Sequence, residues 1–181
     1  MFKNTALLIC DIQKKTIKNL HNKDLVINNI NKLLYIKPFL DNWKLSIKSE
    51  FIPNKLGNID EKINKCNIDF IYEKYTYSMY NNFLKNKLTE HKINNIILTG
   101  MEIQWCINQT VYDLTKDFTV HIPVDAVGNS LNLSDNYYNL KNLENNGALL
   151  TTTDSIICNN LNNANEKSSK EYVNYLKKIF K

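Results

Sequence analysis

The sequence predicts an α/β protein built on a single doubly wound sheet, with six parallel strands and helices on both faces. Short apolar runs alternate with segments of helical spacing along the whole chain. The first run, residues 5–10 (TALLIC), is apolar throughout, as expected of a central strand buried on both faces. The chain has 181 residues, of which 43% are hydrophobic and 23% charged, and shows no internal repeat or linker. We therefore expect residues 1–181 to form one domain.

The first half of the chain contains three predicted strands and two helices. Apolar residues at helical spacing predict a helix over residues 25–40, which closes near Pro38. A loop containing Pro53 and Gly57 follows the second strand. The three strands are predicted at residues 5–10, 45–51 and 68–72, and the second helix at 80–88.

The second half repeats the alternation. The fourth strand, residues 96–98, is expected to break at Thr99-Gly100 before a helix over residues 103–116. A helix over residues 136–146 stops at Gly147, where a left-handed cap belongs. Thr153-Asp154 is expected to cap the next helix. The remaining strands are predicted at residues 118–124 and 148–152, and the remaining helices at 155–161 and 170–180.

Composition and spacing argue against several classes of ligand. The net charge of +5 comes entirely from lysine, is spread along the chain, and includes no arginine for bidentate contacts to guanine, so we do not expect nucleic acid as a partner. The four cysteines (10, 66, 106 and 158) and three histidines (21, 91 and 121) lack zinc-ligand spacing, and no glycine-rich nucleotide motif is present. We expect neither a metal nor a cofactor.

Scattered cysteines without CxxC pairs favour a reducing compartment. No secretory signal is visible, and no apolar run is long enough to span a bilayer. We expect a cytoplasmic protein without a membrane partner, and a mitochondrial location is the alternative.

Three reactive side chains follow the carboxyl ends of predicted strands, at the edge where such sheets bind ligands. Asp11 follows the first strand, Lys74 the third, and Cys106 the turn after the fourth. Taken singly, each has an ordinary explanation, as a helix cap, a surface cation and a packed thiol. Together they supply an acid-base, a cation that favours thiolate and carboxylate, and a nucleophile. Backbone N–H groups of Glu102 and Cys106 could hold an oxyanion.

Four blocks of the sequence carry a resemblance to a known family. They are residues 7–16 (LLICDIQKKT), 73–80 (EKYTYSMY), 99–114 (TGMEIQWCINQTVYDL) and 147–157 (GALLTTTDSII). They resemble the isochorismatase-like cysteine hydrolase superfamily, and in particular its isochorismatase domain-containing proteins of unassigned substrate. TGxExxxC together with D-x-Q is the most specific part.

This resemblance implies a six-stranded parallel sheet and an Asp–Lys–Cys catalytic triad at Asp11, Lys74 and Cys106. It also implies a non-proline cis peptide between Met101 and Glu102, which aims the Glu102 N–H into the oxyanion hole. Members assemble as dimers, tetramers or larger rings, so a homo-oligomer is expected by analogy.

The chain also departs from parts of that family. Nicotinamidases of the superfamily bind a metal through an Asp/His cluster after the second strand, but the corresponding loop here, SEFIPNKLGNID, has no histidine. We therefore expect no such metal site. Hydrolysis of the isochorismate vinyl ether needs no thiol, so retention of Cys106 favours acyl transfer from an amide. The absence of arginine also removes a specific clamp for a dicarboxylate.

Further residues have two readings each. Phe51, Tyr75, Tyr77 and Trp105 flank the expected site and either line a flat pocket or simply pack. Gln13 orients either the ligand or a loop. We interpret Asp125 at a later strand end as structural.

The main hypothesis is a cysteine hydrolase that cleaves the C–N bond of a small-molecule amide through a thioester. One alternative is a non-catalytic scaffold or binding protein that keeps the fold. A weaker alternative is a ribonuclease-like activity, which requires a continuous basic groove leading to Cys106.

Overall fold

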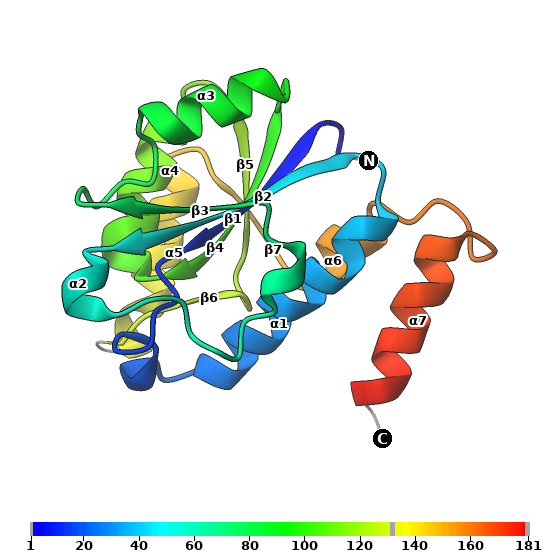
Figure 1. Cartoon of the computed structure of the whole chain (residues 1–181), viewed down its shortest axis with the longest axis horizontal. Coiled ribbons are helices and arrows are strands. Elements are labelled where there is room, and N and C mark those ends of the chain that lie inside the picture. Colours follow the sequence, from blue (N-terminus) through cyan, green and yellow to red (C-terminus); the bar gives the residue numbers. More distant parts are fainter. Residues whose placement is uncertain (1, 131–132, 180–181) are drawn as a thin grey trace.

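A parallel sheet lies between two layers of helices (Figure 1). The computed structural model describes residues 2–130 and 133–179. In these residues the sheet order is β3-β2-β1-β4-β5-β7, and the short strand β6 pairs with the end of β4. The strands are β1 Thr5–Cys10, β2 Trp43–Phe51, β3 Phe70–Lys74, β4 Asn95–Met101, β5 Thr119–Pro123, β6 Val127–Gly128 and β7 Leu149–Thr151. The predicted fold class is confirmed, with β6 as an unpredicted addition to the six expected strands.

Strand β1 occupies the centre of the sheet because its side chains are apolar on both faces. Ala6 and Leu8 enter the core under one layer of helices, whereas Leu7 and Ile9 enter the core under the other. All six residues of β1 are buried. Its last residue, Cys10, is in register with Ser49 of β2 and Gly100 of β4, so these three strands end together.

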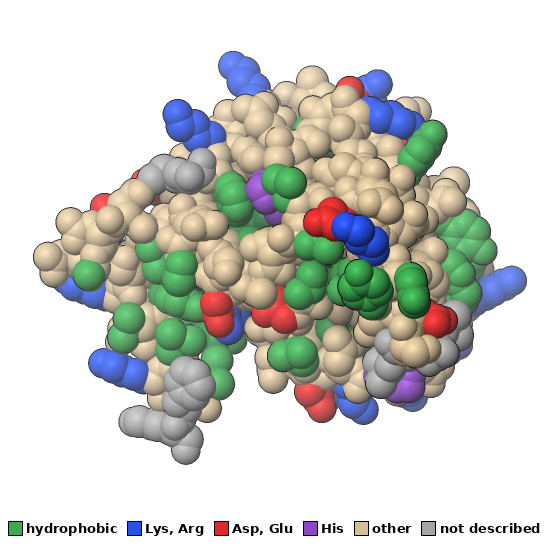
Figure 2. Space-filling model, turned by 180° about the vertical axis from the view of Figure 1, so that it is seen from behind, with side chains coloured by type: hydrophobic (Ala, Val, Ile, Leu, Met, Phe, Trp, Pro, Cys, Tyr) green, Lys and Arg blue, Asp and Glu red, His purple; other side chains and the backbone are tan. Residues whose placement is uncertain are grey.

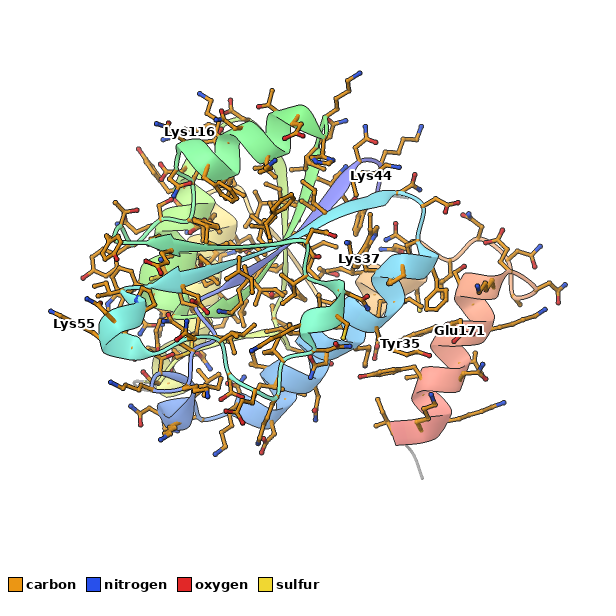
Figure 3. The ribbon with its side chains drawn as sticks, viewed as in Figure 1. Tyr35, Lys37, Lys44, Lys55, Lys116 and Glu171 are labelled. Atoms are coloured by element: carbon orange, nitrogen blue, oxygen red, sulfur yellow. The ribbon has the colours of Figure 1, made fainter. Side chains whose placement is uncertain are left out.

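Helices α3, α4 and α5 cover one face of the sheet, and α1, α6 and α7 cover the other (Figure 1). On the second face, α7 lies outermost, against α1. Tyr35 of α1 and Glu171 of α7 point toward each other (Figure 3), and the tyrosine hydroxyl donates a hydrogen bond of 3.0 Å to the carboxylate. The helices are α1 Lys23–Ile36, α3 Asn82–Glu90, α4 Asn108–Leu114, α5 Asn136–Asn145, α6 Thr153–Cys158 and α7 Lys167–Ile179.

Short helical turns connect these elements. Helix α2, Pro53–Leu56, follows β2, and a π-helical turn, Ile103–Ile107, leads from β4 into α4. The 3-10 turns are Ile17–Asn19, Lys37–Phe39, Lys65–Asn67 and Leu133–Asp135. The last residue of the helix predicted over residues 170–180, Phe180, lies outside the described residues.

Three local predictions were wrong. Strand β4 does not break at Thr99-Gly100 but continues to Met101, because Gly100 still pairs with β1 and β6. The helix expected over residues 103–116 is divided into the π turn and α4. The side chain that caps α6 is Thr152, which accepts a hydrogen bond from the Ser155 N–H.

Two other predictions at helix ends are confirmed. Gly147 follows α5 with a φ of +92°, as expected of a left-handed cap. Asp125 is structural, because its carboxylate accepts hydrogen bonds of 2.9 Å from both the backbone N–H and the hydroxyl of Thr153 at the start of α6. Asp154, expected as a cap, instead accepts hydrogen bonds from Lys32 and Tyr172.

In the described part of the chain, none of the helices is both long enough and apolar enough to cross a bilayer.

Candidate active site

Asp11 lies directly after β1, where the backbone turns with a φ of +52°. One carboxylate oxygen, Oδ1, accepts a 2.7 Å hydrogen bond from the Ser49 hydroxyl at the end of β2. The other oxygen, Oδ2, lies 2.8 Å from the ammonium of Lys74. Asp11 is almost completely buried, so its carboxylate is held by these contacts with neighbouring side chains and not by solvent.

Lys74 is the last residue of β3, and its side chain is fully buried. Its ammonium donates to the backbone carbonyls of Tyr77, at 2.8 Å, and Thr76, at 3.1 Å, and it lies 3.5 Å from the Cys106 sulfur. The Phe51 ring lies under the same ammonium, with its centroid 4.5 Å away. A buried cation is tolerated here because acceptors surround it.

The electrostatics of this group favour a charged lysine. Burial by itself lowers the pKa of Lys74, but its interactions with Cys10, Asp11 and Cys106 outweigh that effect and leave the pKa above its ordinary value. Lys74 is therefore an ammonium at neutral pH. It can stabilise negative charge on both the carboxylate and the thiol next to it.

Cys106 belongs to the π-helical turn that follows β4. The wider turn is closed by a hydrogen bond of 3.1 Å from the Ile107 N–H to the Glu102 carbonyl. Thr110 donates to the Cys106 carbonyl at 2.6 Å and accepts from the Met79 N–H at 2.9 Å. These contacts tie the turn to the segment after β3, which also carries the carbonyls that hold Lys74.

The peptide bond between Met101 and Glu102 is cis, at the position where the family resemblance implies one. The Glu102 carboxylate accepts hydrogen bonds from the Ser130 N–H, at 2.8 Å, and from the Ser130 hydroxyl, at 2.7 Å. Gln104 donates to the same carboxylate at 3.2 Å. Glu102 is thus anchored beside the cysteine turn.

A cavity of about 310 Å³ opens over these groups, which is the size of a small-molecule site. Its apolar wall consists of Phe51, Leu56, Tyr77, Met101 and Trp105. Its polar wall consists of Asp11, Thr16, Asn19, Glu102, Cys106 and Ser130. None of the described residues that line it is basic. Lys74 is buried and is not among the lining residues.

The structure brings together the three side chains of the predicted triad, but only some of the predicted pocket residues line the cavity. Phe51, Tyr77 and Trp105 line the cavity, as expected. Tyr75 does not: its side chain is exposed and its hydroxyl donates to Glu73, so that prediction needs correction. Strand alternation explains the difference, because Lys74 points inward and its neighbour therefore points outward.

Gln13 orients a loop. Its side-chain amide donates to the Phe51 carbonyl at 3.1 Å and accepts from the Phe51 N–H at 2.9 Å, and it also donates to the Gly57 carbonyl. The side chain is fully buried and does not line the cavity. It fixes the loop that carries Leu56, a wall residue.

Sequence reasoning missed five residues that complete the site, namely Thr16, Asn19, Ser49, Leu56 and Ser130. Ser49 had a usable signal, since it is a small polar residue near the carboxyl end of a predicted strand. Ser130 follows β6, an element of two residues that has no periodicity to detect.

One cluster of metal-type ligands occurs within residues 2–130 and 133–179: Cys10, Asp11 and Cys106, whose ligand atoms lie within 4.8 Å of one another. The Lys74 ammonium contacts two of the three groups. A metal cation bound by these groups would lie close to the Lys74 ammonium, and the two positive charges would repel each other. The geometry therefore fits an acid-base and nucleophile cluster better than a metal centre.

Known proteins resemble this chain in both sequence and structure. Residues 54–155 match the family model described as "Isochorismatase domain". Isochorismatase family protein 2B of Dictyostelium discoideum is 33% identical over 187 residues, covering 93% of this chain and 83% of the relative. Protein 1B of the same organism is 34% identical over 177 residues, covering 93% and 84%. The structure of MAR1 ribonuclease from Caenorhabditis elegans superposes with a TM-score of 0.86 at 28% identity, covering 95% of this chain and 88% of that one.

Proposed function

The chain belongs to the isochorismatase family, and from that premise we propose that it is a cysteine hydrolase that cleaves the C–N bond of a small amide through a thioester. One observation carries the proposal. The Lys74 ammonium contacts the Asp11 carboxylate at 2.8 Å and the Cys106 sulfur at 3.5 Å, and Asp11 and Cys106 both line the cavity. A nucleophile, an acid-base and a stabilising cation within contact distance are the groups that acyl transfer requires.

In the proposed reaction, the Cys106 thiolate attacks the amide carbonyl carbon. The tetrahedral intermediate collapses as the C–N bond breaks, and Asp11, which has taken the thiol proton, delivers it to the departing amine. Water then attacks the thioester while Asp11 accepts its proton, and the carboxylic acid leaves with regeneration of the thiol. Lys74 stabilises the charge on Cys106 and Asp11 throughout.

The N–H groups of Glu102 and Cys106 are proposed to hold the oxygen of the tetrahedral intermediate. Both belong to residues that line the cavity: Glu102 precedes the π turn and Cys106 lies within it. The Glu102 carboxylate, bound by Ser130, keeps this residue fixed. Donors placed before the reaction stabilise an oxyanion without reorganisation.

The cavity wall also indicates the charge of the substrate. Three aromatic rings line it, and no basic side chain does so among the described residues. A substrate carboxylate or phosphate would find no cation there and would meet Glu102. We therefore propose an uncharged amide of a size that fits about 310 Å³.

The direct test is a mass-spectrometric screen of small amides with the wild-type protein and a Cys106→Ala variant. We expect turnover in the wild type to fall by about 10³-fold or more in the variant, since the nucleophile is lost. A Cys66→Ser variant, at an exposed thiol outside the cavity, serves as the matched control and should keep full activity. Rapid quenching should trap an acyl adduct on the Cys106 peptide. Full turnover by Cys106→Ala would refute the nucleophile role.

A second candidate function comes from the relative named as a ribonuclease, which is 28% identical over nearly the whole chain. That activity would require RNA to reach Cys106. The cavity at Cys106 has the volume of a small molecule and no basic lining in the described residues, which favours the amide hydrolase. The open cavity with converging reactive groups also favours a hydrolase over a non-catalytic scaffold.

A further inference from the structure

A second thiol lies beside the proposed nucleophile. Cys10, the last residue of β1, is fully buried, and its sulfur lies within 4.8 Å of both the Cys106 sulfur and an oxygen of Asp11. The Cys10 S–H donates to Asp11 Oδ2 at 3.4 Å. The reaction proposed above uses Asp11 and Cys106 but has no role for Cys10.

The two thiols differ in exposure to small molecules. Cys106 lines the cavity, so a small reagent in the cavity reaches its sulfur. Cys10 lies behind it with no exposed surface. Burial, followed by its neighbours Cys106 and Asp11, raises the pKa of Cys10 well above its ordinary value, so this thiol stays protonated at neutral pH. An oxidant in the cavity therefore meets the Cys106 sulfur first, and the Cys10 sulfur can react only with the oxidised Cys106.

From this geometry we propose that Cys10 is a resolving thiol, which forms a reversible disulfide with Cys106 when a small peroxide oxidises the nucleophile. The inference requires a reactive Cys106 but not amide turnover. It assigns a modification site to the same cluster and predicts that peroxide inactivates the protein without destroying Cys106.

The chemistry balances in two steps. The Cys106 thiolate attacks the peroxide, the O–O bond breaks, and the departing alkoxide or hydroxide takes a proton from solvent, which leaves a sulfenic acid. Cys10 then transfers its proton to Asp11, and its sulfur attacks the Cys106 sulfur. The S–S bond forms as the S–O bond breaks, and the departing hydroxide recovers the proton from Asp11 as water. The two sulfurs lose two electrons, and the peroxide gains them.

Asp11 is what makes the second step feasible. A buried thiol with a raised pKa is a poor nucleophile until a base removes its proton. The Asp11 carboxylate already accepts the Cys10 S–H, and Lys74 at 2.8 Å stabilises its charge. The other two cysteines, Cys66 and Cys158, are exposed and lie outside this cluster, so they serve as internal comparisons.

The test starts from a Cys66→Ser/Cys158→Ser protein, which retains Cys10 and Cys106 as its only thiols. After treatment with hydrogen peroxide, unreacted thiols are alkylated under denaturing conditions and the intact mass is measured. We expect the loss of two hydrogens, no alkylation, and a Cys10–Cys106 cross-linked peptide on digestion. Dithiothreitol should restore both thiols.

The matched variant adds Cys10→Ala to the same background. Without a resolving thiol, Cys106 should gain two or three oxygens, and the fraction of Cys106 recovered by dithiothreitol should fall several-fold. The inference is overturned if the parent protein gains oxygens on Cys106 while Cys10 stays alkylatable. Peptide mapping of the parent protein by itself decides whether the Cys10–Cys106 disulfide forms. The test therefore does not depend on the folding of the Cys10→Ala variant.

These outcomes separate the two proposals. A protein that forms the disulfide but hydrolyses no amide overturns the amide hydrolase and leaves the resolving thiol in place. A protein that hydrolyses amides through Cys106 but never links it to Cys10 overturns the resolving thiol alone.

Discussion

The buried ammonium of Lys74 contacts both the proposed acid-base, Asp11, and the proposed nucleophile, Cys106. Its position bears on why the proposed nucleophile need not lie on a long regular helix. The Lys74 ammonium lies 3.5 Å from the Cys106 sulfur, so negative charge formed on that sulfur in the proposed reaction has a cation beside it without the help of a helix terminus. The positive charge of Lys74 is satisfied by the carbonyls of Thr76 and Tyr77, which follow it in the chain.

We predict that Lys74→Met slows alkylation of Cys106 at neutral pH by about tenfold or more, because the thiolate loses its nearest cation. The rate is measured by iodoacetamide labelling and quantification of the Cys106 peptide. Alkylation of the exposed Cys66 in the same sample is the control and should not change. An equal rate for Cys106 in both proteins would mean that Lys74 does not activate the thiol.

A second buried lysine, Lys48 of β2, gives a separate prediction on stability. Burial lowers the pKa of Lys48 from its ordinary 10.5, and the attraction of Glu50 and Asp11 offsets only part of that effect. As pH rises between the lowered pKa and 10.5, the unfolded chain binds more protons than the folded one, so this residue makes stability rise with pH. Below that window, the buried ammonium costs stability.

We therefore expect Lys48→Met to remove a positive slope in the free energy of unfolding, worth at most about 1.4 kcal/mol per pH unit, in the window that lies between the lowered pKa and 10.5. Glu50 keeps donors in the variant, from the Ile59 N–H at 2.6 Å and the Asn58 amide at 3.2 Å. Urea unfolding of both proteins across the window measures the difference. Parallel curves would show that Lys48 does not titrate there. Lys74, whose pKa is raised, acts with the opposite sign and only above 10.5.

At the scale of elements, the end of β4 and the turn after it position the cysteine. Gly100 has a φ of +112° and passes so close to β1 that an added Cβ would lie 2.1 Å from the Cys10 carbonyl oxygen. The strand can therefore pair with β1 up to its end and still deliver Met101 and Glu102 to the cavity. The local sequence pattern predicts a break here, because a glycine after an apolar run usually marks a turn. The close approach of two strands depends on tertiary structure and leaves no local pattern.

Gly100→Ala should consequently destabilise the protein by more than about 4 kcal/mol, since backbone atoms rather than a flexible side chain meet the new methyl group. Gly147→Ala is the matched control. It also has a positive φ, of +92°, but its nearest neighbour would be the Thr115 Cβ at 3.5 Å, so only the conformational cost of about 1–2 kcal/mol remains. Chemical denaturation compares the two. Equal losses would show that the contact with Cys10 is not the cause.

The elements were predictable to different degrees for physical reasons. Strand β1 matches its expected limits because five consecutive apolar residues after Thr5 favour a strand in a sheet covered on both faces. The π turn at Ile103–Ile107 could not be predicted, because apolar spacing of three and four fits an α-helix equally well. Asp11 and Lys74 were predictable as strand-end residues, whereas the contacts of Lys74 with Asp11 and Cys106 depend on sheet order.

Across the whole molecule, the sequence predicts layers and strand direction, and tertiary pairing decides which ends meet. The order β3-β2-β1-β4 places the carboxyl ends that carry Lys74, Asp11 and the cysteine turn side by side, although 63 and 32 residues separate them in sequence (74 − 11 and 106 − 74). The expected homo-oligomer stays a prediction. The expectation that nucleic acid is not the main ligand also stays a prediction. The distribution of charge on the surface is relevant to this expectation.

Lysine side chains are dispersed over the molecular face seen in Figure 2, among uncharged and acidic side chains, without a continuous basic strip among the coloured residues. The net charge of +5 should still attract RNA non-specifically at low salt. That attraction arises from scattered lysines, whereas the Lys74 ammonium is buried and unavailable to a phosphate. Binding of RNA should therefore be independent of the cavity.

We expect RNA binding, measured by fluorescence anisotropy with a labelled single strand, to weaken about tenfold or more between roughly 50 mM and 200 mM salt. Cys106→Ala should bind RNA as the wild type does, because Cys106 lies in the cavity and the change leaves the surface lysines intact. Any RNA cleavage in the preparation should likewise persist in the variant and be removed by further purification. Salt-resistant binding, or cleavage abolished by Cys106→Ala and retained by Cys66→Ser, would instead make the ribonuclease the function of this site. The dispersed charge and the small volume of the cavity both favour the opposite result, which agrees with the proposed attack of Cys106 on a small amide.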